Sequence, residues 1–176
     1  DGSIDGATGT YAVAMGYQTT ASGYNSTALG YQTTASGEHS TALGKETTAS
    51  GYYSTAMGWQ TIASGQHSTA IGHSSTTASG AYSIAIGGTV TASANGSIAI
   101  GGATTASGDL STAMGYKTTA PSYAETVIGS YNTDYTPDTD GDTQWNTNDR
   151  LFVVGNGADG NNKSDAMVIL KNGKIG

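Results

Sequence analysis

A repeat of 14 residues constrains this chain more than any other feature of its sequence. The segment YQTTASGYNSTALG at residues 17–30 returns as YQTTASGEHSTALG, KETTASGYYSTAMG and WQTIASGQHSTAIG, which extends the repeat to residue 72. Related copies continue to about residue 130, and one of them carries an extra residue near Ser74 and Ser75. Because a unit of this length cannot bury an apolar surface alone, the repeat predicts a stack of coils that share one core.

Two columns of residues mark the end of every copy. A glycine closes the copy and an aliphatic residue stands directly before it. The glycines are Gly16, Gly30, Gly44, Gly58, Gly72, Gly87, Gly101, Gly115 and Gly129, and the aliphatic residues are Met15, Leu29, Leu43, Met57, Ile71, Ile86, Ile100, Met114 and Ile128. A column of Thr, Ile or Val lies two residues before the aliphatic one. Since alternate strand residues share a face, we expect both columns to look into the core.

Two further columns consist almost entirely of alanine, and they predict close packing. One runs from Ala14 to Val127 between the two columns just described, and the other runs from Ala21 to Ala120 in the second half of each copy. Each copy is thus predicted to form two short strands separated by glycine turns. Stacking at about 4.8 Å per coil would give a rod of roughly 40 Å. The alanines predict an additional packing surface, so we expect several chains to lie side by side.

Composition excludes several classes of protein. The chain has 27 glycines, one phenylalanine, 11% charged residues and a net charge of −7. The sequence is thus poor in large apolar side chains, but its repeat is too regular for a disordered segment. Its six Lys and Arg residues are scattered, so we expect no nucleic-acid partner. Cysteine is absent, and no membrane-spanning or signal segment is found. Because the chain begins at Asp1 and stops at Gly176, we interpret it as a fragment of something longer.

The unit S-x-A-h-G, where h is aliphatic, resembles the head repeats of trimeric autotransporter adhesins of the YadA-like kind. It occurs as STALG, STAMG, STAIG and SIAIG, with a second glycine in the middle of most copies, and the resemblance covers roughly residues 3–130. The resemblance implies an all-β fold, a left-handed parallel β-roll of 14-residue coils. It also implies a parallel homotrimer, an extracellular position and a role in surface adhesion.

Variable columns flank the constant ones and are the predicted exterior. Tyr53, His67 and Tyr82 occupy one of them, and Tyr17, Tyr31 and Trp59 occupy the column after the closing glycine. Aromatic rings stacked along a rod offer apolar faces with polar tips, which suits sugar rings or extended polypeptide. We therefore predict a multivalent ligand-binding ladder, and cross-strand stacking with a purely structural role is the alternative.

The repeats contain no catalytic arrangement. Acidic residues are few and lie in variable columns, and no serine, histidine and carboxylate are brought together, so we expect a non-enzymatic protein. Paired threonines such as Thr19 and Thr20 recur and would suit an ice-binding face, but Ile62 and Val90 interrupt the rows. Ice binding is thus a minor alternative, as is a polysaccharide-degrading tail spike.

The composition changes after the repeats, which predicts three segments. Residues 1–130 form the β-roll head, residues 131–149 an Asp-rich loop or linker, and residues 150–176 a neck-like β-hairpin with two apolar runs. Asp138, Asp140 and Asp142 alternate as carboxylates do in calcium loops, so calcium is the one cofactor that the sequence suggests, against a plain solvated turn. The last segment resembles the stretch that follows head repeats in fibre proteins of bacterial surfaces and phage-like particles.

These observations predict a fibre or adhesin head that binds a glycan, a matrix protein or a cell surface through repeated exterior columns. A passive spacer within a tail fibre or an injection-machine fibre is the structural alternative. We expect homotrimers, an extracellular ligand and no membrane insertion within these residues. The ligand and the kind of parent protein are not predicted.

Overall fold

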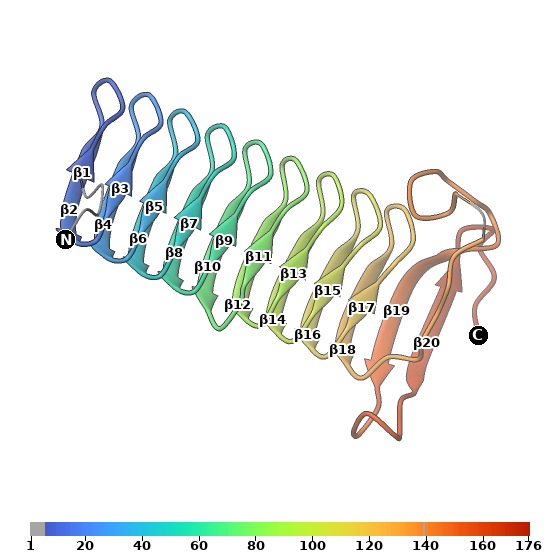
Figure 1. Cartoon of the computed structure of the whole chain (residues 1–176). Coiled ribbons are helices and arrows are strands. Elements are labelled where there is room, and N and C mark those ends of the chain that lie inside the picture. The colour runs from blue at the N-terminus through green and yellow to red at the C-terminus, as the bar shows by residue number, and fades with distance from the viewer. Residues whose placement is uncertain (1–5, 139) are drawn as a thin grey trace.

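The structure is a computed structural model that describes residues 6–138 and 140–176. It is an all-β solenoid in which each 14-residue copy forms one coil, and the coils stack into a rod with both sheets running along its length (Figure 1). Within the described residues there is no helix, and so none that is long and apolar enough to cross a membrane. The predicted parallel β-solenoid is confirmed, whereas the handedness and the trimer that the resemblance implies stay predictions.

Each coil contributes one strand to each of two sheets. The short-strand sheet contains β1 (Gly6–Ala7), β3 (Thr20–Ala21), β5 (Thr34–Ala35), β7 (Thr48–Ala49), β9 (Ile62–Ala63), β11 (Thr77–Ala78), β13 (Thr91–Ala92), β15 (Thr105–Ala106) and β17 (Thr119–Ala120). The long-strand sheet contains β2 (Val13–Tyr17), β4 (Thr27–Tyr31), β6 (Thr41–Lys45), β8 (Thr55–Trp59), β10 (Thr69–His73), β12 (Ile84–Gly88), β14 (Ile98–Gly102), β16 (Thr112–Tyr116), β18 (Thr126–Ser130), β19 (Arg150–Asn156) and β20 (Asp165–Leu170).

The strands pair in register, so each column of the repeat becomes a straight row along the rod. In the pairing of β8 with β10, Ala56 lies beside Ala70, Met57 beside Ile71 and Gly58 beside Gly72. The extra residue near Ser74 and Ser75 lies in a turn, where both residues have positive φ, and the next strand resumes the same register. A turn therefore absorbs the insertion without shifting a strand.

Small side chains make the core. The buried alanines are Ala28, Ala42, Ala56, Ala70, Ala85, Ala99 and Ala113 of the long strands and Ala21, Ala35, Ala49, Ala63, Ala78, Ala92, Ala106 and Ala120 of the short strands. Rows of serine and threonine complete the interior, and some of their hydroxyls donate to backbone carbonyls, such as Ser40 Oγ to Gly37 O at 2.6 Å. The interior of a coil is therefore filled by methyl and hydroxymethyl groups.

The predicted direction of the aliphatic column was wrong. Met57 and Ile71 are each 37% exposed in the single chain, whereas their strand neighbours Ala56 and Ala70 are fully buried. Because the side chains alternate along the strand, the aliphatic column and the Thr, Ile or Val column point outward together. The physical reason is space: the two sheets are lined mainly by Ala, Ser and Thr, and the largest apolar side chains buried between them are those of Val90, Val127 and Val153, so Leu, Ile and Met point outward.

The C-terminal segment continues the rod. Strand β19 pairs parallel with β18 as the next rung of the long-strand sheet, with Val153 beside Val127, and β20 pairs antiparallel with β19. The end of the short-strand sheet is closed differently. There the side chain of Asn132 accepts from Thr119 N at 2.9 Å and donates to Thr119 O at 3.1 Å, as a neighbouring strand would. The C-terminal segment therefore covers the last coil in both sheets.

Candidate binding surfaces

The outward side of the long strands carries an unbroken row of aliphatic side chains with a row of Thr, Ile and Val beside it, and this surface is here called the aliphatic face. Its rows consist of Met15, Leu29, Leu43, Met57, Ile71, Ile86, Ile100, Met114 and Ile128, with Val13, Thr27, Thr41, Thr55, Thr69, Ile84, Ile98, Thr112 and Thr126 beside them. All of these side chains are partly or fully exposed in the single chain. An unbroken row of exposed aliphatic side chains is typical of a surface that packs against another chain.

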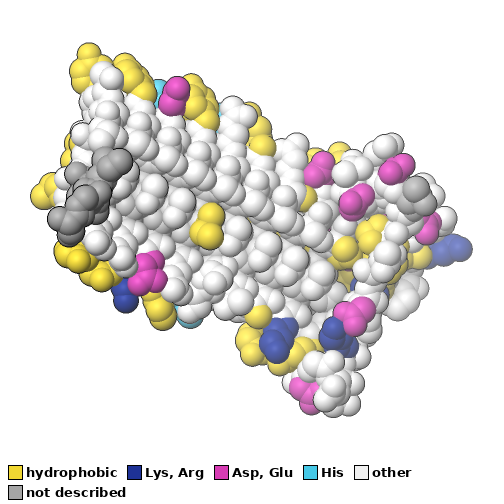
Figure 2. All heavy atoms as spheres, viewed as in Figure 1, with side chains coloured by type: hydrophobic (Ala, Val, Ile, Leu, Met, Phe, Trp, Pro, Cys, Tyr) yellow, Lys and Arg dark blue, Asp and Glu magenta, His cyan; other side chains and the backbone are white. Residues whose placement is uncertain are grey.

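The outward side of the short strands is polar in contrast. Thr20, Thr34 and Thr48 lie in its outward row, and exposed serines such as Ser22 lie two residues further along each coil. Ile62 interrupts that row, whereas Val90 belongs to the buried inner row and leaves the surface unchanged. The broad face in Figure 2 has this character, since hydrophobic side chains gather along its two long edges and are sparse between them.

The first aromatic ladder lies at the ends of the long strands, in the column directly after the closing glycine. The rings of Tyr17 and Tyr31 are stacked with centroids 5.1 Å apart. The ammonium group of Lys45 lies 5.7 Å from the ring centroid of Tyr31 and 5.7 Å from that of Trp59, so it bridges the two rings by cation–π contacts. Gly88 and Gly102 interrupt the column further along, where no side chain can continue it.

The second aromatic ladder lies in the turns that precede the long strands. His39, Tyr53, His67 and Tyr82 are stacked nearly parallel, with successive centroids 4.5, 5.2 and 5.0 Å apart. Tyr52 packs edge-on against the ladder, 4.4 Å from the Tyr53 centroid. The backbone holds the ladder in place, because His67 N donates to Tyr52 O at 2.7 Å and Tyr82 N donates to Gln66 O at 2.7 Å.

The six predicted ligand-binding residues therefore fall into two groups, one at the ends of the long strands and one in the turns that precede them. Tyr17, Tyr31 and Trp59 lie in the first ladder, and Tyr53, His67 and Tyr82 lie in the second. All six are exposed. Face-to-face stacking covers the ring faces that a sugar ring would use and leaves the ring edges, with their hydroxyl and imidazole groups, toward solvent. Each ladder thus presents polar groups at the repeat of the coil.

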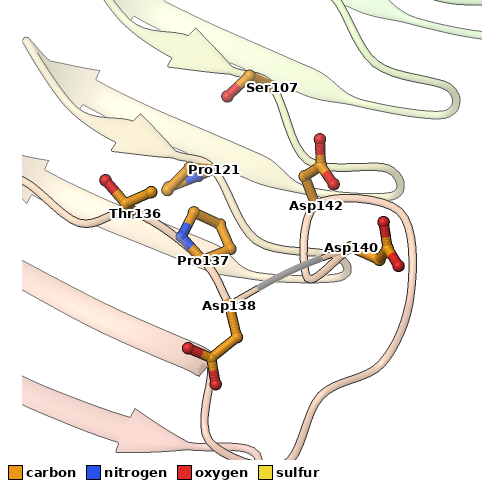
Figure 3. Close-up of a pocket in the computed structure, with 7 residues that line it drawn as sticks. All are labelled: Ser107, Pro121, Thr136, Pro137, Asp138, Asp140 and Asp142. Atoms are coloured by element: carbon orange, nitrogen blue, oxygen red, sulfur yellow. The ribbon is translucent and has the colours of Figure 1, made fainter.

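The three aspartates of the predicted calcium loop line one cavity of about 370 Å³ (Figure 3). Their carboxylates point in different directions around it, with that of Asp138 turned away from those of Asp140 and Asp142. The backbone of this loop docks on the solenoid, because Asp109 N donates to Asp142 O at 2.7 Å. Across residues 6–138 and 140–176, no three His, Asp or Glu side chains gather in a group that could hold a metal ion. The calcium assignment stays a prediction.

A buried polar cluster closes the core at its C-terminal end. Glu125, Asp149 and Lys171 are buried there; the Glu125 carboxylate accepts from Ser122 N at 2.9 Å, and the Asp149 carboxylate accepts from the hydroxyl of Tyr135 at 2.6 Å. Lys171 Nζ lies 3.9 Å from Asp149 Oδ2. Sequence reasoning did not identify this cluster. The available signal was Glu125 itself, which replaces the buried serine of the earlier copies.

Burial perturbs the titration of this cluster. Desolvation raises the pKa of Glu125 from 4.5 to about 7, against the opposing effects of the Ser122 hydrogen bonds and the charges of Arg150 and Lys171. Desolvation likewise lowers the pKa of Lys171, although Asp149 and Glu125 favour its charged form. The pKa of Tyr135 is raised by burial and by its hydrogen bond to Asp149. Protonation of this cluster is therefore coupled to folding.

We expect the free energy of unfolding to fall as the pH rises from about 4.5 to about 7, because the folded protein holds the Glu125 proton more tightly than the unfolded chain does. The stabilisation is complete below pH 4.5 and amounts to about 3 kcal/mol at most. Glu125→Gln should remove this dependence and be more stable than the parent at pH 8. Urea unfolding at pH 5 and pH 8 measures this, with the exposed Glu38→Gln as control. An unchanged difference between the two pH values in Glu125→Gln would contradict the assignment.

Comparison with known families agrees with this geometry. The sequence profile of the YadA head domain repeat, which spans two copies, matches overlapping segments from residue 7 to residue 104 and again residues 106–121. These matches cover more than half of the 176 residues. The chain belongs to the YadA head repeat family. Its YadA head repeats are the coils described above, and both aromatic ladders and most of the aliphatic face lie within the matched residues. A comparison with curated protein sequences finds no significant match.

Proposed function

We propose that the chain is the head of a trimeric, non-enzymatic adhesin that is exposed outside the cell and attaches to a glycan or protein surface. The observation that carries the proposal is the aliphatic face, which runs the length of a YadA head repeat array and stays exposed among the residues that the structure describes. Three chains that pack through this face would bury it around a common axis. That assembly would leave the polar short-strand side outward.

The two aromatic ladders are the surfaces we propose for ligand contact. They flank the polar side and repeat at the spacing of the coils, so one extended ligand can contact several rungs at once, and three chains multiply the contacts. Their edges offer Tyr hydroxyl and His nitrogen groups beside apolar ring carbons, a combination that is enriched in recognition surfaces. The second ladder supports the proposal best, since four of its rings are stacked without interruption.

Binding of the purified chain to arrays of immobilised glycans and matrix proteins tests this proposal. We expect retention on at least one surface, and we expect combined replacement of Tyr53, His67 and Tyr82 by alanine to weaken it at least tenfold, because exposed aromatic anchors contribute about 1–2 kcal/mol each. The matched control replaces the exposed serines Ser36, Ser50 and Ser64 by alanine. Retention that survives the aromatic replacements would remove the ladder from the proposal, and no retention on any surface would favour a passive spacer.

Ice binding is a second candidate, and one observation favours it. The outward threonine row of the short-strand sheet is interrupted by Ile62 alone, because Val90 lies in the buried row. Thermal hysteresis of the purified chain distinguishes an ice-binding face from an adhesive one.

A further inference from the structure

A second cavity lies where the regular coils meet the C-terminal hairpin. It has a volume of about 340 Å³ and is lined by Ala103, Lys117, Thr119, Tyr131, Gly160 and Lys163. The first four come from the last coils of the solenoid, and the last two come from the loop that joins β19 to β20. Its size falls in the range of small-molecule sites. None of the six residues belongs to the two variable columns that the sequence predicts to bind a ligand.

Hydrogen bonds fix the walls of this cavity relative to one another. Ser164 N donates to Tyr131 O at 3.1 Å, and Gly157 N donates to Ser130 O at 3.0 Å. The hydroxyl of Ser130 also donates to Gly157 O at 2.9 Å. The loop between β19 and β20 is thus tied at both of its ends to the turn that carries Tyr131. The cavity is a formed feature of the junction rather than a gap beside a loose loop.

The charges of the cavity are unbalanced toward positive. Lys163 Nζ is paired with Asp134 Oδ1 at 2.5 Å. The ammonium group of Lys117 lies 5.4 Å from the ring centroid of Tyr131 and 5.9 Å from that of Tyr116, and it forms no ion pair within the described part of the chain. In a chain of net charge −7, an exposed lysine that lies over aromatic rings and forms no ion pair is available to bind a negative group.

We infer that this cavity binds a sugar unit that carries a carboxylate. The Lys117 ammonium would pair with the carboxylate, the Tyr131 ring would pack against the carbon side of the sugar, and the Thr119 hydroxyl would hydrogen-bond a sugar hydroxyl. A bare inorganic anion would interact with the Lys117 ammonium through charge, and the Tyr131 ring and the cavity volume would not contribute to its binding. This inference rests on the proposed adhesive function and deepens it, because it names an acidic glycan as the ligand class.

The cavity stays open in the proposed assembly. Thr119 belongs to β17 of the short-strand sheet, and Ala103 and Lys117 lie in the turns beside it, whereas the trimer is proposed to pack through the aliphatic face. Each trimer would therefore present three such sites near one end of the rod. A polymer with several acidic units could occupy more than one of them and gain from the multivalency.

Ligand-observed NMR titration of the 176-residue protein tests the inference, with methyl glucuronide as the acidic probe and methyl glucoside as its neutral partner. We expect saturable binding of the glucuronide, at least tenfold weaker binding of the glucoside, and weaker binding of the glucuronide at high salt. Equal binding of the two sugars would overturn the inference. Competition by inorganic phosphate at equal concentration would overturn the sugar part, since it would show a general anion site.

Two lysine variants locate the site. Lys117→Gln should weaken glucuronide binding about tenfold, because it removes one charge-assisted contact while it keeps a side chain of similar length. Lys174→Gln is the matched control, since Lys174 is also an exposed lysine that forms no ion pair within the described residues, but it belongs to neither aromatic ladder and lines neither cavity described above. Equal losses in the two variants would overturn the assignment to this cavity. Retention on glycan or matrix arrays without glucuronide binding would refute this site and leave the adhesive function standing.

Discussion

Gly58→Ala is expected to disrupt the centre of the solenoid. Gly58 has φ of +123°, and a Cβ atom there would lie 1.8 Å from the carbonyl oxygen of Gly72 in the next coil. The backbone of Gly72 cannot shift away, because Gly72 belongs to β10, which is paired with β8 on one side and with β12 on the other. We expect a loss of at least about 3 kcal/mol in the free energy of unfolding, from backbone strain and broken strand pairing together.

Gly160→Ala is the matched control for this variant. Gly160 has no atom within 4 Å of an added Cβ, and its φ lies outside the left-handed region. We expect it to unfold at the same denaturant concentration as the parent, whereas Gly58→Ala should unfold earlier and lose hydrogen-exchange protection in β8 and β10. Equal midpoints for the two variants would show that the coils can separate to admit a methyl group, and that the closing glycine is not a steric requirement.

Much of the architecture could be predicted from the repeat. The 14-residue period sets the length of a coil, and the fixed columns of glycine and alanine indicate two strands and their turns. Because identical residues recur at identical places, register follows directly, as in the pairing of Gly58 with Gly72. A repeat supplies the same local instruction many times, so each prediction for one coil applies to all of them.

The side of the strand that faces the core could not be predicted by the rule that larger apolar residues lie inside. In a coil this thin, the opposing sheet is too close for Leu or Ile, so Ala28 is buried and Leu29 lies on the outer side. The rule assumes a single chain that must bury its own apolar surface. The rule fails where an apolar surface packs against another chain instead. The exposed aliphatic face supports such packing between chains.

The ladders could be predicted only in part. Column alignment placed Tyr53, His67 and Tyr82 together on the exterior, and the structure places them in one stacked row. Sequence did not indicate that these turn residues adopt positive φ, of +55°, +56° and +58°, which is unusual for aromatic side chains. Hydrogen bonds between successive turns hold that conformation. At the resulting spacing the rings cover one another's faces, so the ring edges are exposed to solvent.

The C-terminal features depend on long-range contacts that no local pattern contains. The apolar run at Leu151–Val154 predicted a strand, but its place as the next rung beside β18 follows only from the fold. The same holds for the cluster of Glu125, Asp149 and Lys171, whose members are far apart in sequence. The cavity at Lys117 and Lys163 is likewise formed by segments that the sequence alone does not bring together.

Ile71→Asp is expected to convert the proposed trimer into a monomer that keeps its fold. Ile71 lies on the aliphatic face in β10 and is 37% exposed in the single chain, so an aspartate there can be solvated when the chain is alone. In a trimer with cyclic symmetry, the three copies of residue 71 lie at the same height around the axis. The interface would then have to bury three carboxylates close together, which is unfavourable both for desolvation and for repulsion.

Ile62→Asp separates this effect from a general loss of apolar surface. Ile62 is 40% exposed, slightly more than Ile71 at 37%, but it lies in β9 on the polar side of the same coil. Light scattering should give a trimer mass for the parent and for Ile62→Asp and a monomer mass for Ile71→Asp, with the same β-sheet circular dichroism in all three. A monomer mass for the parent would refute the trimer, and loss of assembly in Ile62→Asp alone would show that the chains pack through the polar side. Because the two variants make the same chemical change at nearly equal exposure, a difference in mass between them can arise only from the face on which each residue lies.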